Sequence, residues 1–312
     1  MALSKYLDPK NDIAFKKIFG TEKNKDILMH FLNDILGFSK DHSIVDIEFL
    51  SPILSPKIAV KKQSILDVLC KDKKGTKYII EMQVAQSRGF EKRAQYYASQ
   101  VYGNQANIGD EYHGLKEIIF IAIADCIIFP EKSHYKSDHV ILDKITHEHD
   151  LKDFFFTFIE LPKFHKTKEE LSTTEEKWCY FFKHAHKTTE AELQKIVGSD
   201  TIIHRAYTAL DQFHWTENEL ATYEELKRIH MDNKAVIAHQ VYEMDNAKAK
   251  SKLEGRAEGR AEGRLEGKIE LAKRLLQNGV GMDVIALSAD LSKEQIEDLQ
   301  KHILDGTTAI NF

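Results

Sequence analysis

Cysteine is scarce in this sequence. The chain has three cysteines, Cys70, Cys126 and Cys179, which lie far apart in the sequence and form no CxxC pair. Their odd number and their spacing argue against a disulfide framework and a cysteine zinc site. Long apolar runs are missing too, since the longest, Ile118–Ala124, is far shorter than a bilayer span. Residues 1–15 show no apolar run behind a basic start. We therefore expect a soluble, cytoplasmic protein with reduced thiols and no membrane partner.

An overall excess of positive charge is also absent. The 44 lysines and arginines face 49 acidic residues, a net charge of −5, which argues weakly against a nucleic-acid partner. Residues 57–93 differ, with ten basic residues against four acidic ones. We interpret Lys61 and Lys62 in this segment as candidate DNA contacts, and a merely solvated surface is the alternative. The sequence contains no GxxxxGK[ST] phosphate loop and no GxSxG nucleophile elbow.

The chain changes character along its length. Apolar spacing predicts two early helices, the second closed by Gly37 at a C-cap position. Short segments rich in branched residues then predict strands, at 44–50, 64–70, 78–84, 118–124 and 154–161, with a helix at 90–102. Because a strand–helix–strand order implies a parallel crossover, residues 1–165 are predicted to form an α/β core with a mixed sheet.

The rest of the chain is predicted to be helical, as a region at 166–250 and a small module at 251–312. A four-residue Glu-Gly-Arg repeat runs from Leu253 to Lys268. On a helix, its like charges repel at i,i+4 and each glycine costs about 1 kcal/mol relative to alanine. We therefore predict that the helix at 251–270 pairs with a second copy, giving a homo-oligomer; a flexible charged linker is the alternative.

Residues 64–84 predict a β-hairpin with a three-residue loop at 73–75, where glycine fits the last position. This loop pairs Asp67 directly with Glu81. A two-residue turn would instead pair Asp67 with Met82 and move Glu81 to the opposite face of the sheet.

Two directly opposed acids are unfavourable in a sheet, since their Cβ atoms lie roughly 5 Å apart. The apolar neighbours of Asp67 and Glu81 predict internal strands, where unpaired carboxylates are costly. A divalent cation removes both problems, and two oxygen ligands with water positions suit Mg²⁺ or Mn²⁺. Gln83 lies two residues after Glu81, on the same face, and can orient water or hold a phosphate oxygen. A strand residue with an ordinary polar role is the alternative for Gln83.

Asp67, the hairpin and Glu81-Met-Gln83 resemble the D…ExQ variant of the PD-(D/E)XK nuclease motif, in which lysine is the more usual third residue. Several blocks are similar to the recombination-promoting nuclease and transposase family: NDIAFKKIFG at 11–20, LDV at 66–68, IEMQ at 80–83, KRAQYY at 92–97 and GDEY at 109–112. Together they span most of residues 9–165.

The resemblance implies a restriction-endonuclease-like fold and a magnesium-dependent bacterial DNA endonuclease linked to recombination or mobile elements. It also implies that Asp12 is an accessory metal ligand and that Arg93 meets a phosphate. A helix N-cap is the alternative for Asp12, and packing against Tyr97 is the alternative for Arg93. The competing function is a catalytically degenerate DNA-binding or assembly protein whose helical half mediates oligomerisation. A nuclease acting on RNA or single strands also stays open.

Overall fold

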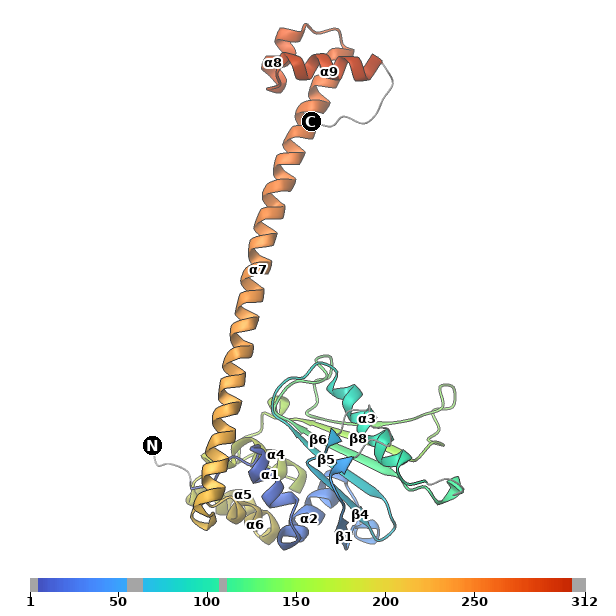
Figure 1. Cartoon of the computed structure of the whole chain (residues 1–312), viewed down its shortest axis with the longest axis vertical. Helices are drawn as coiled ribbons and strands as arrows, with labels where there is room; N and C mark the ends of the chain where they lie inside the picture. Colours follow the sequence, from blue (N-terminus) through green and yellow to red (C-terminus); the bar gives the residue numbers. More distant parts are fainter. Residues whose placement is uncertain (1–4, 55–63, 107–110, 305–312) are drawn as a thin grey trace. The chain divides into compact units, whose positions relative to one another are not determined.

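The computed structural model describes residues 5–54, 64–106 and 111–304. Two compact units divide the chain, Met1–Asp232 and Asn233–Phe312. The first unit holds the β-sheet (Figure 1). The acids of the predicted site, Asp67 and Glu81, belong to the same unit. The predicted DNA contacts Lys61 and Lys62 lie outside the described residues.

A six-stranded mixed sheet forms the centre of the first unit (Figure 1). In spatial order its strands are β1 (Ile47–Phe49), β4 (Val68–Asp72), β5 (Lys77–Gln83), β6 (Ile118–Ala124), β8 (Phe154–Glu160) and β7 (Lys136–Val140). β5, β6 and β8 are parallel, and the other three pair antiparallel with their neighbours. The helix α3 (Phe90–Gly103) connects β5 to β6, so the predicted crossover and the α/β class are confirmed.

Burial explains which strands the sequence predicts well. All seven residues of β6 are buried and apolar, as expected for a central parallel strand covered on both faces. β7, at the edge of the sheet, has the sequence Lys-Ser-Asp-His-Val and alternates between exposed and half-buried, and the sequence pattern does not predict it. The predicted strand at 64–70 is two strands, β3 (Ser64–Ile65) and β4, interrupted at Leu66 and Asp67. β3 pairs with the short β2 (Ile53–Leu54) in a separate sheet.

Helices cover one face of the sheet with an aromatic core. They are α1 (Asp12–Phe19), α2 (Lys25–Leu36), α4 (Thr174–His184), α5 (Glu190–Val197) and α6 (Thr201–Ala209). Phe19, Phe31, Trp178 and Phe182 are at most 1% exposed and contact one another, with ring centroids 5.2–6.0 Å apart. They belong to one cluster with the inward side chains of β4, β5 and β6. The predicted helical region after residue 166 therefore completes the core of the α/β sheet.

The opposite face of the sheet is covered by α3. Four buried residues at helical spacing, Phe90, Ala94, Ala98 and Val101, pack against Leu69, Ile79, Phe120 and Phe158 of the strands. Because strand side chains alternate between faces, Ile79 and Glu81 of β5 both point toward the α3 face.

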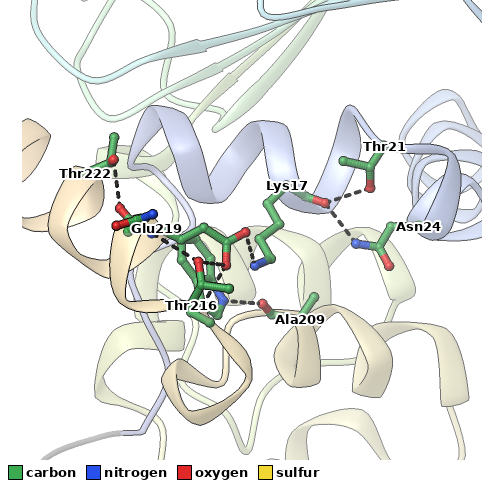
Figure 2. A network of polar contacts seen from close by, with 9 residues as sticks. Lys17, Thr21, Asn24, Ala209, Thr216, Glu219 and Thr222 are labelled. Atoms are coloured by element: carbon green, nitrogen blue, oxygen red, sulfur yellow. Dashed lines mark hydrogen bonds and ion pairs between the residues drawn. The ribbon is translucent and has the colours of Figure 1, made fainter.

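The long helix α7 (Glu217–Gln277) begins in the first unit, where its first turn is tied to α1 (Figure 2). Thr216 and Glu219 form reciprocal capping bonds, with Thr216 N–H donating to Glu219 Oε2 at 2.8 Å. Lys17 of α1 forms an ion pair with Glu219 at 2.5 Å and lies 4.2 Å from the centre of the Trp215 ring. These contacts hold α1 against the start of α7.

The second unit has a small apolar core of its own. Ala272 of α7 packs with residues of α8 (Met282–Ala289) and α9 (Lys293–Leu304). A capping box begins α9, since Ser292 N–H donates to Gln295 Oε1 at 2.9 Å and Gln295 N–H donates to Ser292 Oγ at 3.2 Å. The Glu-Gly-Arg repeat lies within α7 and is helical. None of the described helices has the length and apolar character that crossing a membrane requires.

Candidate active site

The β4–β5 hairpin has the register predicted from its loop. Val68 pairs with Ile80, and Cys70 pairs with Tyr78. Gly75 has a φ of +89°, a left-handed conformation that favours glycine. The alternative two-residue turn is therefore excluded, and one step beyond the last pair the chain brings Asp67 next to Glu81.

The backbone holds these two carboxylates side by side. The N–H of Asp67 donates to Glu81 Oε1 at 3.1 Å, and the N–H of Met82 donates to Asp67 Oδ2 at 2.8 Å. The side chain of Asp67 is 18% exposed, and Glu81 is 6% exposed. Each acid is thus fixed by a backbone donor next to the other acid, in a place with little water.

Burial and mutual repulsion disfavour the charged forms of both acids. Burial is the main cause that raises the pKa of Asp67 to about 6, with a further contribution from the charge of Asp12. Burial and then the charge of Asp67 raise the pKa of Glu81 to about 8. Strongly raised pKa values on adjacent buried acids are typical of functional sites rather than of stabilising ion pairs.

This arrangement predicts that the metal-free protein loses stability as the pH rises from about 4 to 8. Unfolded Asp and Glu titrate near pH 4, whereas the folded pKa values are about 6 and about 8. The folded state therefore binds more protons in this window, and the free energy of unfolding falls as they leave. Melting temperatures measured in EDTA across this range should show the decline.

Two variants make the pH measurement specific. Glu81→Gln removes one of the two adjacent acids, so the melting temperature of this variant should depend less steeply on pH. Glu48→Gln removes a mostly exposed acid of β1 that pairs with Lys71 at 3.0 Å, and it should retain the slope of the unmodified protein. Equal slopes in all three proteins would contradict the assignment of the pH dependence to the acid pair.

Gln83, at the end of β5, connects the acid pair to α3. Its Oε1 accepts a short hydrogen bond from an Nη of Arg93, and its Nε2 donates to the carbonyl of Ala85. The Arg93 guanidinium also lies 4.8 Å from the Phe90 ring centre and 6.0 Å from that of Tyr97. Among the described residues nothing hydrogen-bonds the buried Nε of Arg93. Arg93 therefore packs on aromatic rings and also extends its charge toward the acid pair.

Asp12 lies at the same site, but it does not cap α1. Asn11 is the N-cap and accepts a hydrogen bond from the N–H of Ile13 at 3.1 Å, while Asp12 is the first helical residue. The N-cap interpretation of Asp12 is therefore wrong. Its carboxylate pairs with Lys16 at 2.9 Å and is close enough for its charge to raise the pKa of Asp67. The role of Asp12 as an accessory ligand stays a prediction.

Lys16 is the residue that sequence reasoning missed. Its Nζ lies 3.8 Å from Asp67 Oδ1 in addition to its contact with Asp12. The four-residue separation of Asp12 and Lys16 places both on one side of α1. That spacing was the available signal, although nothing in the sequence relates residue 16 to residue 67.

The acid pair suits a hard divalent cation. The backbone donors bind Glu81 Oε1 and Asp67 Oδ2, so the second oxygen of each acid has no backbone donor and can bind a ligand. Carboxylate oxygens are the donors that Mg²⁺ uses, with water and substrate phosphates completing its shell. The described parts of the chain contain no group of three or more His, Cys, Asp or Glu side chains arranged around a common point. The donor set therefore fits an ion shared with water and substrate.

The sequence also contains two His-x-His segments, at 147–149 and 184–186. Burial lowers the pKa of His184 to about 4, and its ring packs against Tyr180 with centroids 4.6 Å apart. His147 takes a left-handed conformation, with a φ of 60°, in a loop before β8. A packing or loop role accounts for these two residues.

Comparisons with known proteins bear on the same part of the chain. The family described as PD-(D/E)XK nuclease family transposase matches residues 9–240. The match includes the sheet, the acid pair, and the helices α1 to α6 together with the beginning of α7. Searches of curated proteins and of solved structures each found no match.

Proposed function

The chain belongs to the PD-(D/E)XK nuclease family transposases, and from this membership and its acid pair we propose that it is a divalent-metal-dependent DNA endonuclease. The observation that carries the proposal is the placement of Asp67 and Glu81, which are adjacent, largely shielded from solvent, and each held by a backbone donor on one oxygen only. Without an ion such a pair destabilises the fold, so its presence calls for a function.

Each residue of the site has a role in this proposal. Asp67 and Glu81 would hold Mg²⁺ or Mn²⁺, which when bound supplies Lewis acidity at the phosphate and lowers the pKa of water. Arg93 binds a phosphate oxygen through its guanidinium, and Gln83 keeps Arg93 in position through their hydrogen bond. In the reaction, a water molecule gives up a proton as its oxygen bonds to phosphorus, the bond from phosphorus to one sugar oxygen breaks, and that sugar oxygen takes a proton from solvent. One strand end keeps the phosphate and the other gains a hydroxyl.

Duplex DNA is the proposed substrate, in line with a role in recombination or in mobile elements. A nicking assay tests the activity. Supercoiled plasmid should convert to open circles with Mg²⁺ or Mn²⁺ and stay intact in EDTA. Protein that shifts DNA in a gel without metal-dependent cutting would favour the degenerate, DNA-binding alternative. Preferential cutting of single-stranded DNA or RNA would correct the substrate class.

We also propose that the repeat in α7 pairs with the same helix of a second copy. The side chains of residues 253–264 are exposed, and a Cβ added to Gly255, Gly259 or Gly263 would meet no other atom within 4 Å. No contact within the described parts of the chain therefore accounts for these glycines. The repeat carries equal numbers of Glu and basic residues, and two copies can place stripes of opposite charge against each other.

Light scattering coupled to size-exclusion chromatography tests this pairing. The full chain should show a multiple of the 35.9 kDa subunit mass. A chain ending at residue 250, or a full chain carrying Arg256→Glu, Arg260→Glu and Arg264→Glu, should elute with the mass of one subunit. An oligomeric mass that is unchanged in both proteins would contradict the pairing.

A further inference from the structure

The acid pair has few positive charges near it. Two carboxylates and an approaching phosphodiester bring negative charge together, and more develops on the phosphate as water attacks. The motif in the family name, PD-(D/E)XK, has a lysine two residues after its second acid. This chain has Gln83 at that position. A glutamine carries no charge, and the side chain of Gln83 is already bonded to Arg93 and to Ala85.

Lys16 brings an ammonium group to the site from a different element. Its Nζ lies 2.9 Å from Asp12 and 3.8 Å from Asp67. Its positive charge lowers the pKa of both Asp67 and Glu81, against the stronger effect of burial. The field of this one lysine therefore reaches both acids.

The position of Lys16 is fixed although its end is accessible. The buried residues Phe15, Ile18 and Phe19 anchor α1 in the core, and the neighbouring Lys17 pairs with Glu219. The Lys16 side chain is 41% exposed, and its contact with Asp12 is an exposed i,i+4 pair. Exposed pairs of this kind contribute little to stability, so the ammonium can exchange Asp12 for a phosphate oxygen at little cost.

We propose that Lys16 is a further catalytic residue of this nuclease, which supplies from α1 the positive charge that Gln83 cannot supply from β5. This inference rests on the proposed function. The Lys16 ammonium donates a hydrogen bond to a non-bridging oxygen of the scissile phosphate. It offsets the charge that builds up as the new bond to phosphorus forms and the old one breaks.

Single-turnover nicking of supercoiled plasmid with Mg²⁺ and saturating protein tests the proposal. Lys16→Met should lower the rate at least about 100-fold, the usual effect of removing one charge-stabilising donor. Lys16→Arg should keep a larger share of the rate than Lys16→Met. The double variant Lys16→Met with Gln83→Lys returns a cation to the site, and it should cut at least tenfold faster than Lys16→Met alone. Lys23→Met, which removes an exposed lysine beyond α1, should leave the rate unchanged.

Two further readouts separate a catalytic role from a structural one. The melting temperature of Lys16→Met, and its affinity for plasmid in Ca²⁺, should stay close to those of the unmodified protein. The role of Lys16 would be overturned if Lys16→Met cut at half the normal rate or better while Asp67→Asn did not cut. That result would leave the nuclease proposal intact. The role of Lys16 would also be overturned if Lys16→Met both lost cutting and melted at a lower temperature, and if neither Lys16→Arg nor the double variant recovered the cutting rate. If the unmodified protein cuts DNA with neither Mg²⁺ nor Mn²⁺, the proposed function fails as well.

Discussion

Asp67→Asn should abolish metal-dependent DNA cleavage and leave the fold at least as stable as before. The asparagine oxygen can still accept the hydrogen bond from Met82 N–H, so the local geometry is retained. The charge that would hold the metal is lost, and because that ion contributes several kcal/mol to the transition state, the rate should fall at least about 100-fold. In the metal-free protein the repulsion on Glu81 disappears, so the melting temperature in EDTA at pH 8 should rise.

A plasmid-nicking time course with Mg²⁺, paired with melting curves in EDTA, measures both effects. Glu48→Gln is the matched control, since it removes one negative charge from the same sheet at a mostly exposed position. It should change neither quantity. Cleavage by Asp67→Asn at a rate close to normal would refute the assignment of the active site, whatever the melting curves show.

Trp178→Ala should destabilise the first unit by about 3–5 kcal/mol, the range for deleting a large aromatic side chain from a core. Trp178 is fully buried between Phe31 and Phe181, and its indole N–H donates to Asp34 Oδ2 at 2.8 Å. The substitution leaves a cavity and removes that hydrogen bond. Because the core is shared with the sheet, cleavage should be lost near the temperature at which the variant melts.

Urea denaturation of the full chain measures this destabilisation, with the fluorescence of Trp215 reporting on the first unit. Phe213→Ala is the control, because Phe213 is 80% exposed and its removal should change stability by less than about 0.5 kcal/mol. A truncation ending at residue 165 tests the predicted domain boundary there. An equally stable fold in that truncation would show that α4 and α6 are dispensable to the sheet.

Local rules in the sequence predicted the central strands and the acid pair. The hairpin loop with Gly75 determines the register that places Asp67 next to Glu81, and this information lies within about 20 consecutive residues. The continuous apolar run of β6 and the helical spacing of α3 similarly predict a crossover between parallel strands. These features depend on backbone conformation and side-chain period, which short segments encode.

Features that depend on distant segments could not be predicted in the same way. The edge strand β7 has too few apolar residues for an alternating pattern, and it is a strand because β8 is available to pair with it. Lys16 belongs to the site because of how α1 packs on the sheet, and no local rule states that packing. The domain boundary at residue 165 was predicted from the change from strand-like to helical sequence patterns. The aromatic core, however, contains residues from both sides of that boundary.

The contacts of α1 also determine when the site can form during synthesis. Asn11 donates to the carbonyl of Tyr223 at 3.2 Å, the N–H of Asp8 donates to the Tyr223 hydroxyl at 2.9 Å, and Lys17 pairs with Glu219. A ribosome adding roughly 5–20 residues per second needs about 10–40 s to travel from the first of these partners to the last. Throughout that interval Asp12 and Lys16 have been synthesised, but the contacts of their helix with Glu219 and Tyr223 cannot yet form. The site can therefore be completed only late in translation, after the ribosome has passed residue 223.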